Sequence, residues 1–152
     1  MTTEPNATPS ATPNATPNAT KNHTGGCHCG QVRFEVELDL SAGGSMCNCT
    51  VCTKIATVGA IAKPAQFRQL AGEDSLSTYE WGGKISQRKF CKHCGVHCFA
   101  FGHLDVLGGD YVGINLNCLD DFDRGAISIT YWDGRHNNWQ GGMRTTPWPV
   151  LP

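Results

Sequence analysis

The chain has 152 residues, enough for one domain, and a formal net charge of -1 from 12 Lys and Arg against 13 Asp and Glu. It has no run of five or more like charges, so it lacks the basic surface typical of proteins that bind nucleic acid or anionic membranes. It also has no apolar stretch long enough to span a bilayer and no signal-peptide pattern at its start. We therefore expect a cytoplasmic protein with no nucleic-acid or membrane partner.

Residues 1–24 differ in composition from the rest of the chain. From Asn6 to Thr20 the sequence repeats combinations of Asn, Ala, Thr and Pro, with one Ser and no aromatic or large aliphatic residue. Such a segment buries too little apolar surface to offset the entropy that is lost on ordering. We therefore expect a disordered tail over residues 1–24 and one folded domain over residues 25–152.

The folded part begins with an alternating segment. Over residues 31–38 polar and apolar side chains alternate, which is the period of a strand with one buried face. The residues expected to face the core are Val32, Phe34, Val36 and Leu38.

Short β-tolerant runs follow, separated by turn residues. They predict strands over residues 57–62, 67–70, 76–81, 85–90, 98–101, 111–116 and 126–132. Short helical turns are expected after Cys49 and Leu119, and three prolines predict an extended segment over residues 146–152. Because the chain has 18 glycines and no sustained helical period, these elements predict an all-β fold of short-stranded, layered sheets resembling a β-sandwich.

The nine cysteines are the main chemical signal. In a reducing compartment, close cysteine spacings favour metal binding or catalysis over disulfides. Seven of the nine form two close pairs and one triplet: Cys27-x-Cys29, Cys91-x-x-Cys94 and Cys47-x-Cys49-x-x-Cys52.

The two pairs together supply the four ligands of a tetrahedral zinc site. On extended backbone the side chains of Cys27 and Cys29 point to the same side. The Cys91-x-x-Cys94 spacing makes a tight turn that Gly95 allows to fold back. We expect a closed, structural zinc site that ties the start of the domain to its middle.

The triplet offers three thiolates, and three protein ligands with a vacant position are typical of a catalytic zinc. Three thiolates and Zn²⁺ carry a formal charge of -1, so the ion suits a soft ligand such as a substrate thiol better than water. The alternative is a second closed site, completed by one of Cys98, Cys118, His97 or His103.

The cysteines and their neighbours also resemble a known family, the glutathione-dependent formaldehyde-activating enzymes, whose domain is shared with centromere protein V. The resemblance runs from about Gly25 to Trp139. It rests on the ordered set Gly26-Cys27-His28-Cys29-Gly30-Gln31-Val32-Arg33-Phe34, Cys47-x-Cys49-x-x-Cys52 and Phe90-Cys91-x-x-Cys94-Gly95-x-His97.

The resemblance implies an all-β fold with two zinc ions. It places Cys27, Cys29, Cys91 and Cys94 on a structural ion and Cys47, Cys49 and Cys52 on a catalytic one. It also implies carbon-sulfur lyase or synthase chemistry, with the condensation of formaldehyde and glutathione to S-(hydroxymethyl)glutathione as the named reaction. Residues 102–110 differ from the family pattern and are expected to form an inserted loop.

The sequence therefore predicts a zinc-dependent enzyme that acts on a thiol-aldehyde adduct, with a small-molecule thiol as its partner. A proton shuttle is also needed, for which His103, His136 and Asp133 are candidates. One rival is a non-enzymatic zinc-binding interaction module that uses exposed tryptophans. A second rival is a redox or metal-buffering role for the triplet together with Cys98 and Cys118.

Overall fold

The structure is a computed structural model that describes residues 19–151. Residues 1–18 of the expected tail lie outside the described residues, whereas residues 19–24 are described. Strand β1 (Lys21–Gly26) pairs antiparallel with β2 (Arg33–Leu38) along its whole length. The domain boundary expected at residue 24 therefore falls inside a strand. The composition did not indicate β1, because this strand has no large apolar side chains. It is held by backbone pairing and by the contact of His23 with Asp121 at 3.1 Å.

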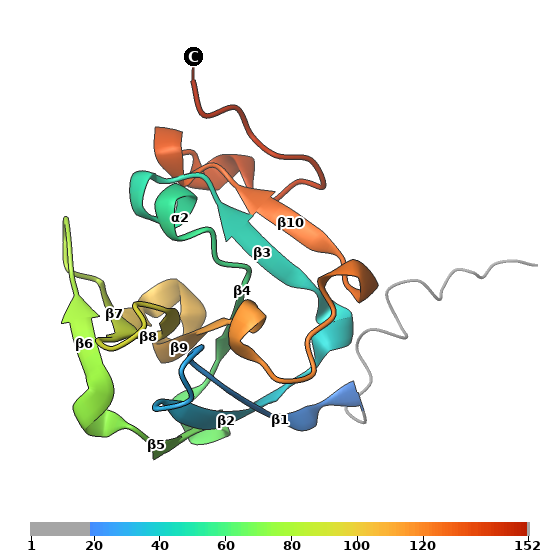
Figure 1. Ribbon diagram of the computed structural model, residues 1–152. Helices are drawn as coiled ribbons and strands as arrows, with labels where there is room; N and C mark the ends of the chain where they lie inside the picture. Colours follow the sequence, from blue (N-terminus) through green and yellow to red (C-terminus); the bar gives the residue numbers. More distant parts are fainter. Residues whose placement is uncertain (1–18, 152) are drawn as a thin grey trace, which may run out of the picture.

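In residues 19–151, ten strands form two layered sheets, as expected for an all-β fold (Figure 1). The smaller sheet has the order β1-β2-β5, and the larger has the order β10-β3-β4-β9-β8-β7-β6. All pairings are antiparallel except that of β10 with β3. The remaining strands are β3 (Gly44–Cys47), β4 (Gly59–Ala62), β5 (Phe67–Ala71), β6 (Leu76–Tyr79), β7 (Ser86–Cys91), β8 (His97–Leu104), β9 (Gly109–Asn115) and β10 (Ile129–Trp132).

The helical elements are short. The α-helix α2 (Thr50–Ile55) follows Cys49, as expected. The turn expected after Leu119 instead precedes it, as η6 (Leu116–Cys118). The other 3₁₀ turns are η2 (Leu40–Ala42), η3 (Pro64–Gln66), η4 (Glu73–Ser75), η5 (Asp105–Leu107), η7 (Arg124–Ala126), η8 (Gly134–His136) and η9 (Trp139–Gly141). None of the helices in residues 19–151 combines the length and apolar character needed to cross a membrane.

The core lies between the two sheets. The four alternating residues of segment 31–38 are buried, as predicted. Phe34 of β2 is fully buried, and its ring centroid lies 5.7 Å from that of Phe67 and 5.5 Å from that of Phe99. Because Phe99 belongs to β8, this aromatic cluster joins the smaller sheet to the larger one.

Residues 102–110 do not form the inserted loop that was expected. Strand β8 continues to Leu104, and β9 begins at Gly109, so the segment is the end of a hairpin with His103 paired opposite Asp110. The turn closes through Gly108, whose φ of +86° is a left-handed conformation and whose N–H donates to the carbonyl of Asp105 at 2.9 Å.

The end of the chain forms no regular element, as the prolines predict, and it bends at residues 146 and 150 rather than being extended throughout. Residues 146–151 form neither helix nor strand. The indole N–H of Trp148 donates to the carbonyl oxygen of Tyr131 at 2.9 Å, which holds this segment against β10.

Replacing Phe34 with Ala tests the core. We expect Phe34→Ala to lower the free energy of unfolding by about 3–5 kcal/mol, because it removes a fully buried ring from the cluster that joins the sheets. Urea denaturation of zinc-saturated protein measures the change. The control is Ile85→Ala, whose side chain is 54% exposed and which we expect to change stability by no more than about 0.5 kcal/mol. Equal losses in both variants would contradict the assignment of the core.

Candidate metal centres

The two cysteine pairs meet in one four-sulfur cluster. Cys27 and Cys29 lie between β1 and β2, whereas Cys91 ends β7 and Cys94 lies in the turn before β8. Their sulfur atoms all lie within 4.8 Å of one another. Two of the Sγ–Sγ distances are 3.6 Å (Cys27 to Cys29) and 3.7 Å (Cys29 to Cys91). Zinc-sulfur bonds of about 2.3 Å in a tetrahedron require sulfurs about 3.8 Å apart, so the cluster fits a tetrahedral zinc ion.

Backbone donors point at this cluster. The N–H of Val32 donates to Sγ of Cys27 at 3.3 Å, and the N–H of His93 donates to Sγ of Cys91 at 3.4 Å. Burial alone would raise the pKa of Cys27, but the hydrogen bond from Val32 and contacts with neighbouring thiols outweigh it and lower that pKa. The surroundings of Cys27 thus favour its thiolate form, which is the form that binds metal.

The triplet forms a second cluster at the junction of β3 and α2. Sγ atoms of Cys47, Cys49 and Cys52 lie within 4.8 Å of one another. The N–H of Cys49 donates to Sγ of Cys47 at 3.4 Å, and the N–H of Cys52 donates to Sγ of Cys49 at 3.5 Å. The backbone at the start of α2 therefore orients the sulfurs.

The charges of the three sulfurs in the triplet favour the binding of a cation. Hydrogen bonds from the thiols of Cys47 and Cys52 lower the pKa of Cys49 strongly. The contact with Cys49 raises the pKa of Cys47, and contacts with Cys47 and Cys49 raise the pKa of Cys52. One thiolate is favoured, but three neighbouring thiolates repel one another unless a positive charge lies between them. Because soft thiolate ligands select soft or borderline metals, the set fits zinc.

Within residues 19–151, no further His, Cys, Asp or Glu joins the triplet to make a fourth ligand. The four residues weighed for that position lie elsewhere. Cys98 and Cys118 are buried and direct their Sγ atoms toward the carbonyls of Val96 (3.5 Å) and His97 (3.4 Å). The ring of His97 stacks on Phe90 with centroids 5.1 Å apart. The arrangement of the described residues thus leaves the triplet with three protein ligands.

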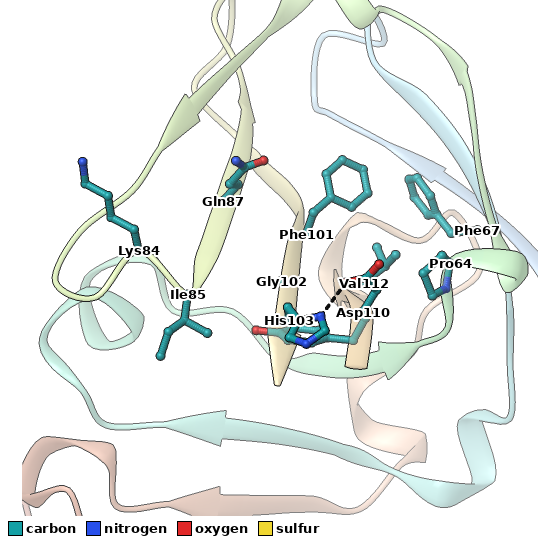
Figure 2. Close-up of a pocket in the computed structure, with 11 residues that line it drawn as sticks. Pro64, Phe67, Lys84, Ile85, Gln87, Phe101, Gly102, His103, Asp110 and Val112 are labelled. Carbon is teal, nitrogen blue, oxygen red and sulfur yellow. Dashed lines mark hydrogen bonds and ion pairs between the residues drawn. The ribbon is translucent and has the colours of Figure 1, made fainter. Parts of the chain in front are cut away.

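His103 lies in a separate hollow of about 450 Å³ at the end of the β8–β9 hairpin (Figure 2). Its Nδ1 contacts Asp110 at 2.7 Å, and its Nε2 contacts Asp105 at 3.3 Å. The hydrogen bond with Asp110 raises the pKa of His103. None of the seven clustered cysteines lines this hollow, so the structure does not bring His103 to the triplet.

Asn48, inside the triplet, is held by the segment that follows β10. Its amide donates to Asp133 at 2.8 Å, and its side-chain oxygen accepts from the N–H of Arg135 at 2.8 Å. Gly134 packs directly on the cluster, because a Cβ at this position would lie 2.5 Å from Sγ of Cys47. Figure 1 shows this orange-red segment beside α2 and β3. These roles were not predicted from the sequence, and the position of Asn48 between two ligand cysteines is the signal that could have indicated them.

Asp133 is the centre of this support. Its side chain is buried and accepts hydrogen bonds from Asn48, His136 and Asn138. Burial alone would raise the pKa of Asp133, but these hydrogen bonds outweigh it and hold that pKa below its usual value. Of the three proton-shuttle candidates, Asp133 and His136 therefore lie against the triplet loop.

The triplet borders a hollow of about 230 Å³, which we call the Cys52 hollow, on the larger sheet. Its floor includes the small residues Gly59, Ala100 and Gly113. Its other lining residues include Cys52, Ile55, Ile61, Arg88, His97 and Tyr111. A second hollow of about 460 Å³, bordered by Lys54, Tyr79 and Trp81, shares Ile55 and His97 with the first. Space for a ligand thus exists on both sides of His97.

Metal content tests the two clusters. We expect the wild-type protein to carry two equivalents of zinc, and each of Cys49→Ser and Cys94→Ser to carry one. Cys94→Ser should lower the free energy of unfolding by at least about 3 kcal/mol, because structural zinc supplies ~10–16 kcal/mol to small domains. Cys49→Ser should change the free energy of unfolding by about 1 kcal/mol or less, because the three ligands of the triplet come from one short segment and do not join distant parts of the chain. Inductively coupled plasma mass spectrometry and urea denaturation measure both. Less than one equivalent in folded wild-type protein would contradict the four-sulfur site.

Asp133→Asn tests the support of the triplet. We expect zinc affinity at the triplet, or turnover, to fall about 10–100-fold, because an amide cannot accept from Asn48 and His136 as a carboxylate does. Competition with a chromophoric chelator measures the affinity. Asp105→Asn is the matched control, because this fully exposed residue lies on the distant hairpin. Equal behaviour of the two variants would argue against a supporting role for Asp133.

Comparisons with known proteins agree with this geometry. The family model described as glutathione-dependent formaldehyde-activating enzyme matches residues 22–134, which include both clusters. A crystal structure of a protein from Rhodobacter sphaeroides superposes with a TM-score of 0.59 at 26% identity, covering 83% of this chain and 99% of that one. The chain therefore belongs to the glutathione-dependent formaldehyde-activating enzyme family.

Proposed function

We propose that the protein is a cytoplasmic, zinc-dependent carbon-sulfur lyase that makes and breaks the bond between a low-molecular-weight thiol and an aldehyde, in an adduct of the S-(hydroxymethyl)glutathione type. The observation that carries the proposal is the triplet itself. It offers three sulfur ligands, has no fourth ligand among the described residues, and borders a hollow large enough for a small thiol. Membership of the family supports the same chemistry.

Cys47, Cys49 and Cys52 would hold the catalytic zinc, and Cys27, Cys29, Cys91 and Cys94 the structural one. When bound at the triplet, zinc would stabilise the thiolate form of the substrate sulfur. The N–H groups of Cys49 and Cys52 keep the ligand sulfurs in position, and Asn48 fixes the loop that carries them.

In the synthetic direction, the thiolate sulfur attacks the carbonyl carbon, and the carbonyl oxygen takes up a proton to become a hydroxyl group. In the reverse direction the hydroxyl loses that proton, the carbon-sulfur bond breaks, and its electron pair returns to sulfur. His136 is the candidate proton carrier, because it is partly exposed and its ring nitrogen lies 2.7 Å from Asp133.

Substitution of Cys52 tests this proposal. We expect Cys52→Ser to lower the rate of exchange between free formaldehyde and S-(hydroxymethyl)glutathione by at least about 100-fold, beyond the ~10–100-fold typical of outer partners of a metal site. The fold should persist, because the four-sulfur cluster is intact. Two-dimensional exchange NMR measures the rate, and circular dichroism checks the fold.

Cys118→Ser is the control, because it removes a thiol that belongs to neither cluster. It should retain catalysis. If Cys52→Ser exchanges at the wild-type rate, the catalytic assignment is wrong and a non-enzymatic zinc-binding module becomes the better interpretation.

A further inference from the structure

The Cys52 hollow contains an arginine that has no protein partner among the described residues. Arg88 lies on β7, is half-buried and lines the hollow together with Cys52. Within residues 19–151 it makes no ion pair and no side-chain hydrogen bond. Each of the other five arginines donates to a protein acceptor: Arg33 to Asp120, Arg68 to Glu35, Arg124 to Met46, Arg135 to Asn48 and Arg144 to Thr146. A half-buried guanidinium with all its donors free is suited to bind an anion.

Apart from the sulfur of Cys52, the described lining residues add no negative charge. Among the residues that the structure describes, no Asp or Glu lines the Cys52 hollow or the second hollow, which carries Lys54. His97, on the wall between the two hollows, has a buried Nδ1 with no hydrogen-bond partner. Burial and the charge of Arg88 lower the pKa of His97, so at neutral pH its ring is uncharged and leaves Arg88 as the cationic group of the Cys52 hollow.

The size of the hollow limits the ligand. Its volume of about 230 Å³ is below the ~300–1,000 Å³ of typical small-molecule sites. The hollow therefore accommodates the chain that links a sulfur at Cys52 to an anionic group at Arg88, rather than a whole drug-sized molecule. The floor of Gly59, Ala100 and Gly113 allows such a chain to lie close to the sheet.

We propose that Arg88 binds a carboxylate of the substrate thiol in the Cys52 hollow, and that the protein therefore selects low-molecular-weight thiols that carry a carboxylate. The inference rests on the proposed function and names the residue that determines its substrate class. A planar carboxylate accepts two parallel N–H bonds from a guanidinium, which both fixes the orientation of the thiol and rejects neutral analogues.

A different role for Arg88 has to be distinguished. With three thiolates a zinc ion at the triplet would have a formal charge of -1, and Arg88 could act only by offsetting that charge. In that case the loss of Arg88 would affect every thiol to the same extent, whether or not the thiol carries a carboxylate. The comparison of charged and neutral thiols thus separates the two roles.

The test compares glutathione with glutathione diethyl ester, in which both carboxylates are blocked. With glutathione, we expect Arg88→Gln to lower kcat/KM for adduct exchange about 10–100-fold, mainly through KM. With the ester, the change should stay within about 2-fold, the scale of unrelated surface substitutions. Arg88→Lys should restore only part of the loss, because an ammonium cannot make the bidentate contact.

Lys89→Gln is the matched control. It removes the same charge from the next residue of β7, but Lys89 does not line the Cys52 hollow and instead donates to Thr78 at 2.7 Å. For Lys89→Gln we expect wild-type values of kcat/KM with both glutathione and its diethyl ester. Urea denaturation verifies that all variants are folded.

Equal losses with both thiols, or no loss with either, would overturn the assignment of Arg88. Failure of the proposed function has a different signature, which is absence of exchange by the wild-type protein with either thiol. Calorimetric titration with S-methylglutathione then tests Arg88 independently. Binding weakened at least about 10-fold by Arg88→Gln supports the carboxylate contact, and unchanged or undetectable binding overturns it.

Discussion

The four-sulfur cluster is the constraint on which the rest of the structure depends. It joins the turn between β1 and β2, in the smaller sheet, to the turn between β7 and β8, in the larger one. The aromatic contact of Phe34 with Phe99 joins the same two sheets through the core. A structural zinc contributes ~10–16 kcal/mol in small domains, which is comparable with the total stability of a domain, about 5–15 kcal/mol. A filled cluster would therefore decide whether the two sheets stay packed.

Because the four-sulfur cluster joins the two sheets, the triplet can have three protein ligands without a loss of stability in the fold. Cys47, Cys49 and Cys52 all come from one short segment, so the fold does not rely on them to join distant parts of the chain. Their loop is instead positioned by two hydrogen bonds of Asn48: its amide donates to the carboxylate of Asp133, and its side-chain oxygen accepts from the backbone N–H of Arg135. A metal site held in this way can exchange its remaining position for a ligand without loosening the sheets.

Local patterns in the sequence predicted much of the fold. The alternation over residues 31–38 identified a buried strand face, and the cysteine spacings grouped seven sulfurs into the two clusters that the structure brings together. Strands β1 and β3 were missed, because they contain few large apolar residues and are held by backbone pairing, β1 with β2 and β3 with β10 and β4. Residues 102–110 were misread for a similar reason: their pairing partners are each other, in a register that composition does not reveal.

The surroundings of the triplet could not be predicted for a deeper reason, since they depend on register between strands far apart in sequence. Gly113 of β9 lies between Ala100 of β8 and Ile61 of β4, and this pairing brings small residues side by side to form the floor of the Cys52 hollow. The ring of Tyr111 lies over Gly102, and a Cβ at Gly102 would approach this ring to 2.4 Å. The absence of a side chain at Gly102 therefore allows Tyr111 to form one wall of the Cys52 hollow.

The same arrangement settles an electrostatic difficulty. A zinc ion with three thiolates is formally anionic and would repel a second anion, so a thiol that also carries a carboxylate would be disfavoured at the triplet. Arg88 lies in the same hollow and has no acidic neighbour among the lining residues to neutralise it. Its positive charge can offset the repulsion and attract the carboxylate at the same time, which makes a charged thiol a more favourable occupant of this hollow than the charge of the triplet alone would allow.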